Sequence, residues 1–209
     1  MVSQAAFWDK IARKYAAKPV DDPDAYEDTL NRTRAHLGAQ DRVLELGCGT
    51  GTTAQKLAND AGHITATDIS AEMIAIANEK ARASNIENAD FARADITSAG
   101  QGAPPFDAVL AFNLLHLLRN VPAALADIRS KMKPGAVFVS KSGCLKGANF
   151  LLRTFALPVM RLIGKAPYVN SFSEAEIDAM IQAAGFEIIE AKTYPGLAPT
   201  RLIIARSTG

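Results

Sequence analysis

The residues with the clearest chemical potential form a Gly-Cys-Gly-Thr-Gly loop at positions 47–51, directly after a short apolar run. A helical pattern follows, so the loop amides gather at a helix N-terminus, where a ligand can accept their hydrogen bonds. Because glycine has no Cβ, a ligand can also approach this backbone closely. The next apolar run ends in Asp68, 21 residues after Gly47, and a carboxylate there can accept two hydrogen bonds from ribose hydroxyls. The loop and the acid together predict a site for a ligand that carries a ribose.

The spacing of the glycines separates this loop from the dinucleotide-binding fingerprint G-x-G-x-x-G. That fingerprint would place a glycine at position 52, where this chain has Thr52. The loop here is G-x-G-x-G, and an acid, Glu45, precedes it by two residues. A nicotinamide-dependent dehydrogenase is therefore the fallback interpretation, and Thr52 counts against it.

The elements that must position these residues follow from the alternation of apolar runs with helical patterns. We expect strands over residues 43–46, 63–68, 91–95, 107–112, 136–140, 186–191 and 202–205. We expect helices over residues 52–59, 71–84, 122–132 and 174–184. Strands that are apolar on both faces and alternate with helices are typical of a parallel sheet covered on both sides. The predicted fold class is therefore α/β, with a doubly wound, mostly parallel seven-stranded sheet.

Caps and turns mark the ends of several of these elements. Ser70 is expected to cap the second core helix, and Ser173 with Glu176 forms a capping box for the last one. Pro134-Gly135 predicts a turn before the fifth strand. A single domain is expected, with a helical lid over 1–38, a ligand-binding core over 43–140, a lid insertion after the fifth strand over 145–172, and the last helix and strands over 173–209.

In the loop, in Asp68 and in the order of strands and helices, the chain resembles the class I S-adenosylmethionine-dependent methyltransferases. It is most similar to their small-molecule branch, near the ubiquinone- and menaquinone-biosynthesis C-methyltransferases. The likeness implies a Rossmann-like methyltransferase fold and S-adenosyl-L-methionine as the cofactor. The positions that match the family's cofactor site are Glu45, Gly47, Cys48, Gly49, Asp68, Ile69, Asp95, Ile96, Asn113 and Tyr15.

The resemblance also implies a role for the polar members of this set. Asp68 would meet the ribose hydroxyls and Asp95 the adenine amino group. Glu45 would oppose the cationic amino group of the methionine end through water or neighbouring backbone. The backbone of Asn113 would face that same end. The aromatic opening at 7–15 resembles the family's N-terminal helix, which closes over the cofactor. Its rings can attract a sulfonium through cation–π contacts; alternatively, they form the apolar stripe of a docking helix.

His116 lies just past the fourth strand and is the candidate catalytic residue. A histidine at this edge could take a proton from a substrate hydroxyl, because it titrates close to neutral pH. Alternatively, it packs under the following helix without touching the substrate. Methyl transfer from a sulfonium is downhill, so proximity and alignment can supply most of the acceleration with no side chain as nucleophile. The two cysteines and three histidines show no metal-ligand spacing, so no metal is expected.

Composition and charge exclude several classes of protein. Apolar residues make up 48% and charged residues 22% of the chain, as in an average soluble protein. No run approaches the roughly 20 apolar residues of a membrane helix. The lack of a signal-peptide pattern and the presence of only two cysteines predict a cytoplasmic location. The net charge of +1 argues against a nucleic-acid partner.

The basic residues are concentrated between residues 128 and 173, which hold eight Lys and Arg side chains and no acid. Such a local field favours an anionic partner. Within it, residues 145–172 are interpreted as a lid over an apolar or anionic substrate, as a peripheral contact with anionic lipid, or as ordinary core packing. The oligomeric state stays open.

Methyl transfer to oxygen, nitrogen or carbon of a small, partly apolar or anionic acceptor is the leading hypothesis for the function. One alternative is a lipid or quinone methyltransferase that acts at the membrane surface. Another is a non-catalytic protein that only binds the cofactor. The acceptor itself is not readable from the residues, because one fold supports many functions.

Overall fold

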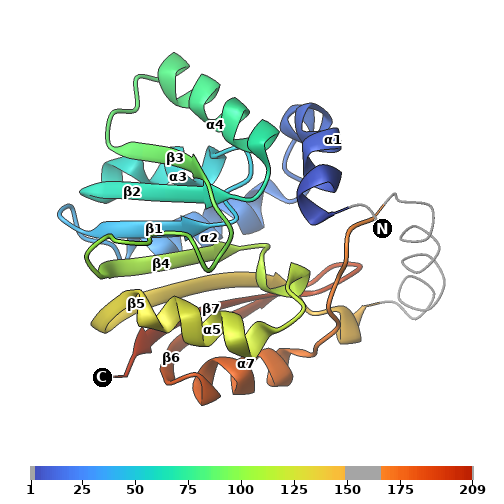
Figure 1. Ribbon diagram of the computed structural model, residues 1–209. Helices are drawn as coiled ribbons and strands as arrows, with labels where there is room; N and C mark the ends of the chain where they lie inside the picture. Colours follow the sequence, from blue (N-terminus) through green and yellow to red (C-terminus); the bar gives the residue numbers. More distant parts are fainter. Residues whose placement is uncertain (1–2, 149–165, 209) are drawn as a thin grey trace.

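The apolar runs of the sequence form the strands of one seven-stranded sheet with the order β3-β2-β1-β4-β5-β7-β6 (Figure 1). The computed structural model describes residues 3–148 and 166–208. The strands are β1 (Arg42–Leu46), β2 (His63–Asp68), β3 (Ala89–Arg93), β4 (Phe106–Phe112), β5 (Met132–Gly143), β6 (Phe186–Tyr194) and β7 (Thr200–Ser207). Neighbouring strands from β3 to β5 are parallel, and β7 is antiparallel to β5 and β6. The predicted doubly wound, mostly parallel α/β fold is confirmed.

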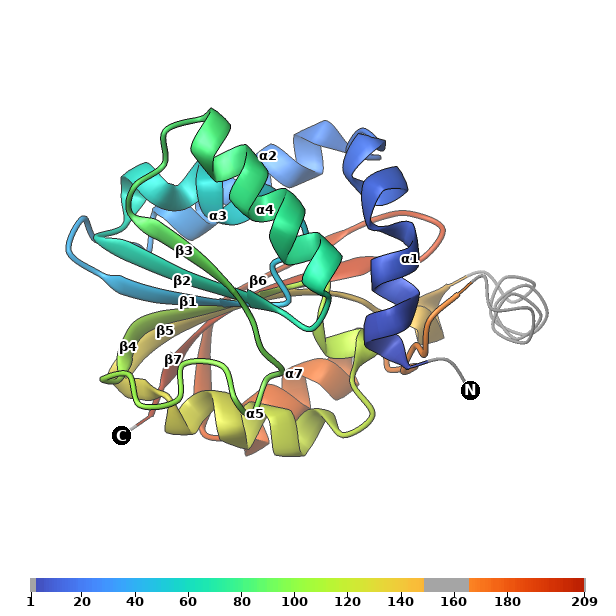
Figure 2. The ribbon, with the colours of Figure 1, turned by 45° about the horizontal axis from the view of Figure 1, so that its top comes forward.

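Helices cover both faces of this sheet. They are α1 (Gln4–Ala17), α2 (Pro23–Arg34), α3 (Thr52–Leu57), α4 (Ala71–Ala83), α5 (Val121–Ser130) and α7 (Glu174–Ala183), with 3-10 turns η1 (Ala58–Asp60), η2 (Leu115–Leu117) and η3 (Leu145–Gly147). The helices α2, α3 and α4 lie on one face, and α5 and α7 lie on the other (Figure 2). Val43 of β1 belongs to the first apolar core and Leu44 to the second. Since successive side chains of a strand point to opposite faces, a continuous apolar run fills both cores.

Most predicted elements agree with the structure to within a few residues, and the fifth strand differs most. β5 is longer than the predicted 136–140 because it is held between β4 and β7 over most of its length. The predicted Pro134-Gly135 turn lies inside β5, where the pairing with β4 is irregular. The helix predicted over 52–59 ends at Leu57 and continues as a 3-10 turn.

Side-chain caps begin α4 and α7 as predicted. The Ser70 Oγ accepts a hydrogen bond of 3.1 Å from the Met73 N–H, and Ser173 with Glu176 forms the capping box of α7. Each cap satisfies amides that have no partner within the first turn of a helix. Because Ser70 follows β2 by two residues, α4 begins at the carboxyl edge of the sheet.

The first helix, α1, lies beyond the carboxyl ends of the strands and packs against α4 (Figures 1 and 2). Its Ala12 is fully buried against Met73 and Ile76. Near its start, the Gln4 Nε2 donates a hydrogen bond of 2.9 Å to the carbonyl of Leu117. The helix therefore connects the segment after β2 with the segment after β4.

A polar network attaches α2 to β6, the last strand in the order of the sheet. The Asp28 Oδ2 accepts hydrogen bonds from Arg32 Nε, Lys192 Nζ and Tyr194 Oη at 2.9, 2.9 and 2.6 Å. These bonds, that of Tyr194 foremost, hold the pKa of Asp28 well below its usual range. Lys141 of β5 lies over the ring of Tyr194, 4.2 Å from its centre, and extends the network to the middle of the sheet.

The insertion predicted over 145–172 is described only at its two ends, because residues 149–165 lie outside the described residues. At the second end, the Asn170 N–H donates to the carbonyl of His116 at 2.6 Å, and its Nδ2 donates to that of Leu118 at 3.2 Å. This end therefore runs across the segment that follows β4. Within residues 3–148 and 166–208, no helix has the length and apolarity needed to span a bilayer.

Candidate functional site

The glycine loop forms the floor of the candidate site at the end of β1. Gly47 has a φ of +67°, and a Cβ there would lie 2.8 Å from Cδ1 of Leu114, too close for a methyl group. The loop therefore packs directly on the segment after β4, which only glycine permits. The buried Cys48 ties the loop to β2, because its N–H donates to the carbonyl of Thr67 at 2.9 Å. Gly49 has a φ of +54°, but a Cβ there would meet no atom within 4 Å, which leaves room for a ligand.

Asp68 lies directly over this loop at the end of β2. Its Oδ2 accepts a hydrogen bond of 3.0 Å from the Gly49 N–H, and its Oδ1 accepts one of 2.8 Å from the Ser70 N–H. Both oxygens keep lone pairs for a ligand. Burial raises the pKa of Asp68, and the two amides partly offset that effect. The neighbouring Ile69 is partly buried, and its carbonyl accepts a hydrogen bond from Arg93.

Glu45 is buried at the base of the loop with one carboxyl oxygen free. The residue is 2% exposed, and its Oε2 has no hydrogen-bond partner among the described residues. The pKa of Glu45 is raised to about 8, first by burial. The charge of Asp68 also raises this pKa, and a hydrogen bond from the Ala54 N–H partly offsets the rise. A cation placed beside this acid would stabilise its charged form. The position therefore suits a positively charged ligand group.

Asp95 and Ile96 follow β3, the strand next to β2. The Asp95 Oδ1 accepts hydrogen bonds from the Ser98 N–H at 2.8 Å and from the Thr97 hydroxyl at 2.7 Å. These bonds, that of the Ser98 amide foremost, lower the pKa of Asp95. Ile96 packs against the apolar core on the α5 side of the sheet. Because β2 and β3 are paired and parallel, Asp68 at the end of β2 and Asp95 just after β3 lie at the same edge of the sheet.

Asn113 and His116 lie on the other side of the loop, past β4. Asn113 has a φ of +53°, a left-handed conformation that is uncommon for a non-glycine residue. The His116 Nδ1 accepts a hydrogen bond of 3.3 Å from the Gly143 N–H, so the neutral ring carries its proton on Nε2. Burial lowers the pKa of His116 to about 4. In this arrangement the Nε2 of the ring is a hydrogen-bond donor, which counts against His116 as a general base. The catalytic role of His116 stays a prediction.

Tyr15 is the member of the predicted set that comes from α1. Tyr15 is 48% exposed, and its ring lies edge-on to that of Trp8 with 6.0 Å between the ring centroids. The pKa of Tyr15 is raised, first because protein atoms shield the hydroxyl end, and the charge of Asp68 adds to the effect. The hydroxyl therefore lies within electrostatic range of the acid over the loop.

One polar residue that the sequence did not place in the site connects α1 to it. The Asp9 Oδ1 accepts a hydrogen bond of 2.6 Å from the hydroxyl of Ser70, 61 positions away. Ser70 was predicted only as a helix cap. Asp9 lies in the segment 7–15, which resembles the family's N-terminal helix, but no local spacing indicates a partner 61 positions away in the sequence.

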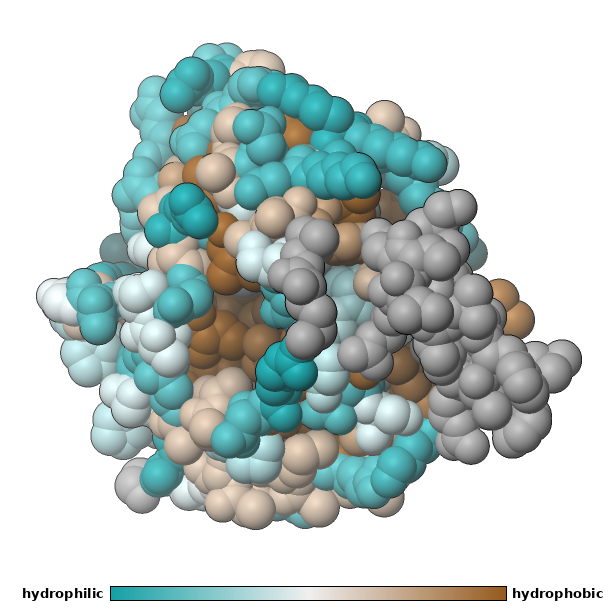
Figure 3. Space-filling model, turned by 45° about the vertical axis from the view of Figure 1, so that its right-hand side comes forward, coloured by the Kyte–Doolittle hydropathy of each residue, from teal (hydrophilic) through white to brown (hydrophobic). Residues whose placement is uncertain are grey.

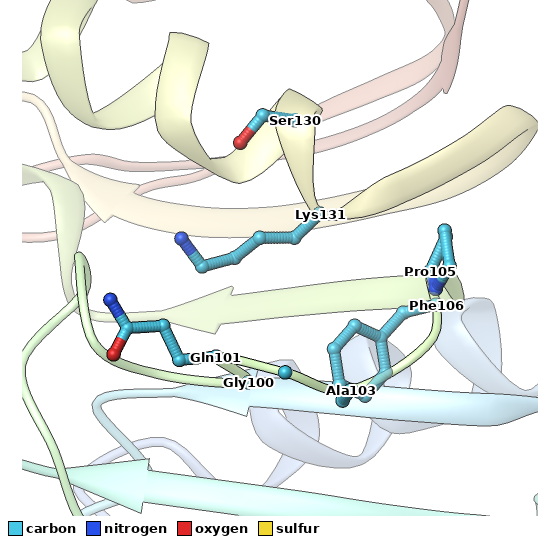
Figure 4. A pocket seen from close by; sticks show the side chains of 8 residues that line it. Gly100, Gln101, Ala103, Pro105, Phe106, Ser130 and Lys131 are labelled. Carbon is cyan, nitrogen blue, oxygen red and sulfur yellow. The ribbon is translucent and has the colours of Figure 1, made fainter.

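A separate cavity of about 210 Å³ lies at the opposite edge of the sheet (Figure 4). It is lined by the loop before β4, including Gln101 and Phe106, and by Ser130 and Lys131 before β5. The amino group of Lys131 is held by Asp127 at 2.6 Å. This cavity shares no residue with the site around the glycine loop.

Known proteins resemble this chain in sequence and in fold. Residues 44–138 match the family described as methyltransferase domain. A ubiquinone biosynthesis O-methyltransferase of Xylella fastidiosa (strain 9a5c) is 31% identical over 151 residues, which cover 70% of this chain and 61% of that protein. The chain thus spans less than two thirds of the length of this relative.

Solved structures show the same fold at low sequence identity. The CcbJ methyltransferase of Streptomyces caelestis has a TM-score of 0.78 at 23% identity, and the likeness covers 100% of both chains. The [4+2]-cyclase SpnF has a TM-score of 0.73 at 18% identity, with 92% of this chain and 85% of that chain covered. A fold that occurs in proteins with such different names does not define the reaction.

Proposed function

We propose that the chain is a class I S-adenosylmethionine-dependent methyltransferase, in line with the methyltransferase-domain match and the Xylella relative, and that it transfers a methyl group from S-adenosylmethionine to a small acceptor. The acceptor atom is an oxygen, a nitrogen or a carbon, and the acceptor is partly apolar or anionic. The support comes from the residues around the glycine loop.

The placement of Asp68 and Glu45 on either side of an open loop carries this proposal. Asp68 offers carboxylate oxygens to a diol, and Glu45 offers a buried oxygen without a partner to a cation. S-adenosylmethionine has a ribose diol and a cationic amino group, so both residues fit it. A dinucleotide could also place a ribose at Asp68, but its pyrophosphate is an anion and offers no complementary charge to Glu45.

When bound, the cofactor supplies a methyl group activated by a positively charged sulfur. Asp68 would hold the ribose, Asp95 would accept from the adenine amino group, and Glu45 would balance the ammonium. The open space over Gly49 lets the ligand lie against the loop backbone. The chain then contributes binding and alignment, which can supply a large part of the acceleration of a two-substrate reaction.

The acceptor would lie beyond Asn113, where η2, α1 and residues 166–172 meet. The surface on this side of the molecule has a hollow with a hydrophobic floor (Figure 3). His116 would supply an N–H to an acceptor oxygen, because its Nδ1 is already occupied. The Xylella relative is by name an O-methyltransferase of ubiquinone biosynthesis, so ring hydroxyls of small apolar compounds are the first acceptors to test.

Thermal unfolding with S-adenosylhomocysteine, S-adenosylmethionine and NADH tests the cofactor. A ligand that binds only the folded protein adds about 2.7 kcal/mol of stability at 100 times its dissociation constant. We expect stabilisation by the two adenosyl-sulfur compounds, its loss in Asp68→Ala and its retention in Asp90→Ala, which removes an exposed acid of β3. Stabilisation by NADH alone would replace the proposal with a dehydrogenase.

A turnover assay separates an enzyme from a protein that only binds the cofactor. We would measure S-adenosylhomocysteine formation with a panel of phenols, catechols, amines and aromatic acids. Product formation with one class identifies the acceptor atom. Tight cofactor binding without turnover of any acceptor would favour the non-catalytic alternative.

A further inference from the structure

A chain of hydrogen bonds joins α1 to the acid over the glycine loop. The Asp9 Oδ1 accepts from the Ser70 hydroxyl at 2.6 Å, and the Ser70 N–H donates to the Asp68 Oδ1 at 2.8 Å. The other oxygen of Asp68 accepts from the Gly49 N–H at 3.0 Å. Asp9 is thus linked to the loop through two intermediate residues.

Ser70 has little freedom in this chain. It is fully buried, and its hydroxyl has one proton, which it donates to Asp9 while its oxygen caps the Met73 N–H at 3.1 Å. Asp9 also accepts from the Glu72 N–H at 3.2 Å, and these bonds, that of Ser70 foremost, lower the pKa of Asp9. Without Asp9, the Ser70 hydroxyl would lose its acceptor in a buried place, which costs free energy unless the side chain turns.

Ser70 also sets the direction of the Asp68 carboxylate. Its backbone N–H holds one carboxylate oxygen, and the same residue begins α4. A change in the Ser70 side chain at the start of this helix would therefore move the amide that holds Asp68. The position of Asp9 is in this way transmitted to the acid that faces the open loop.

Two other contacts of α1 hold the helix without a hydrogen bond to this chain. Arg13 forms a two-pronged ion pair with Glu79 at 2.7 and 2.9 Å, and both side chains are more than half exposed. Ala12 packs in the apolar cluster with Met73. The ion pair makes no hydrogen bond to Ser70 or Asp68, so it serves as a control on the same pair of helices.

We propose that Asp9 is a positioning residue for Asp68, so that docking of α1 and binding of the cofactor's ribose strengthen one another. The inference rests on the proposed function, because it takes Asp68 as the ribose acid. Coupling between two events is reciprocal. A docked α1 should hold Asp68 ready for the ribose, and a bound ribose should hold α1 in place.

The test compares Asp9→Ala with Arg13→Ala, and with Asp9→Asn, which restores an oxygen acceptor. Calorimetry measures S-adenosylhomocysteine affinity, and amide hydrogen exchange by NMR reports on the Gly49 N–H in the free protein. We expect Asp9→Ala to weaken binding about tenfold and to speed exchange at Gly49, Arg13→Ala to change affinity less than twofold, and Asp9→Asn to recover most of the loss.

Several results would overturn the inference. Equal losses in Asp9→Ala and Arg13→Ala would make Asp9 a mere docking contact. Unchanged affinity in Asp9→Ala would do the same, whether or not exchange at Gly49 speeds up. Failure of the unaltered protein to bind S-adenosylhomocysteine would instead refute the proposed function. In that case the exchange measurement still tests the inference, because unchanged Gly49 exchange in Asp9→Ala would show that the hydrogen-bond chain does not position Asp68.

Discussion

Glu45→Gln should stabilise the free protein, although it alters a residue of the candidate site. Glu45 is buried, and its pKa is raised to about 8 from an ordinary value of 4.5. Above pH 4.5 the unfolded chain loses this proton, whereas the folded protein keeps it up to about pH 8. With about 1.36 kcal/mol for each pH unit, the acid costs the fold about 3 kcal/mol at pH 7 and about 5 kcal/mol above pH 8.

The sign of the effect follows from proton linkage. The folded state binds more protons than the unfolded state between pH 4.5 and about 8, so stability falls as the pH rises through that window. Glutamine stays neutral throughout and can still accept from the Ala54 N–H. We therefore expect the stability gain of Glu45→Gln to be near zero at pH 4.5 and to grow to about 3 kcal/mol at pH 7.

Urea denaturation at pH 5, 6, 7 and 8 measures this difference, with Glu87→Gln as the control for an exposed acid. A gain in stability that does not change with pH would refute the reasoning, because it would arise from packing and not from ionisation. The same variant should bind S-adenosylhomocysteine more weakly, since the ligand's ammonium would lose its carboxylate. Unchanged binding would leave Glu45 without a role toward the cofactor.

Three further sets of substitutions test the loop, the α2 network and the last helix. Gly49→Ala should weaken S-adenosylhomocysteine binding and lower stability only by the strain of its left-handed φ of +54°, whereas Gly47→Ala, which is left-handed and also collides with Leu114, should lower stability more; calorimetry and urea denaturation would contradict this if both variants behaved alike. Asp28→Asn should cost about 1–3 kcal/mol at pH 7 and progressively less as the pH falls below 3.8, because an acid with a lowered pKa stabilises the fold fully above its ordinary 3.8 and loses that effect only as the pH falls through the lowered pKa of the folded state; a cost that does not change between pH 7 and pH 2 would argue against it. Ser173→Ala should cost about 1 kcal/mol, and Ser173→Thr should restore most of it in the same denaturation assay.

The sequence determined the type and order of most elements, because the signals for them are local. The strand predicted over 63–68 has the same ends as β2, and the cap at Ser70 and the box at Ser173 begin the helices they were expected to begin. A cap and its partner lie three residues apart, so their pairing is visible in the chain. The fifth strand was predicted too short because pairing with β4 and β7 extends it into polar residues such as Lys141.

The candidate site divides in the same way. The glycine loop and Asp68 were visible because a strand, a tight loop, a helix and a second strand fix the spacing between them. The protonation and the hydrogen-bond partners of the site's side chains were not visible in the sequence. Glu45 has a raised pKa because the sheet and the loop bury it, and His116 has its Nδ1 occupied because β5 ends beside it.

Tertiary packing alone brought Asp9 to Ser70 and so to Asp68. The periodicity of α1 indicates which of its faces is apolar, but it does not indicate which helix covers that face or which polar residue lies at the rim. Those partners are 61 positions apart along the chain, and they meet because α1 packs on α4 at the carboxyl edge of the sheet. A local pattern records what a residue does for its own helix or strand, whereas a hydrogen bond between segments depends on where the packing of the whole domain places them.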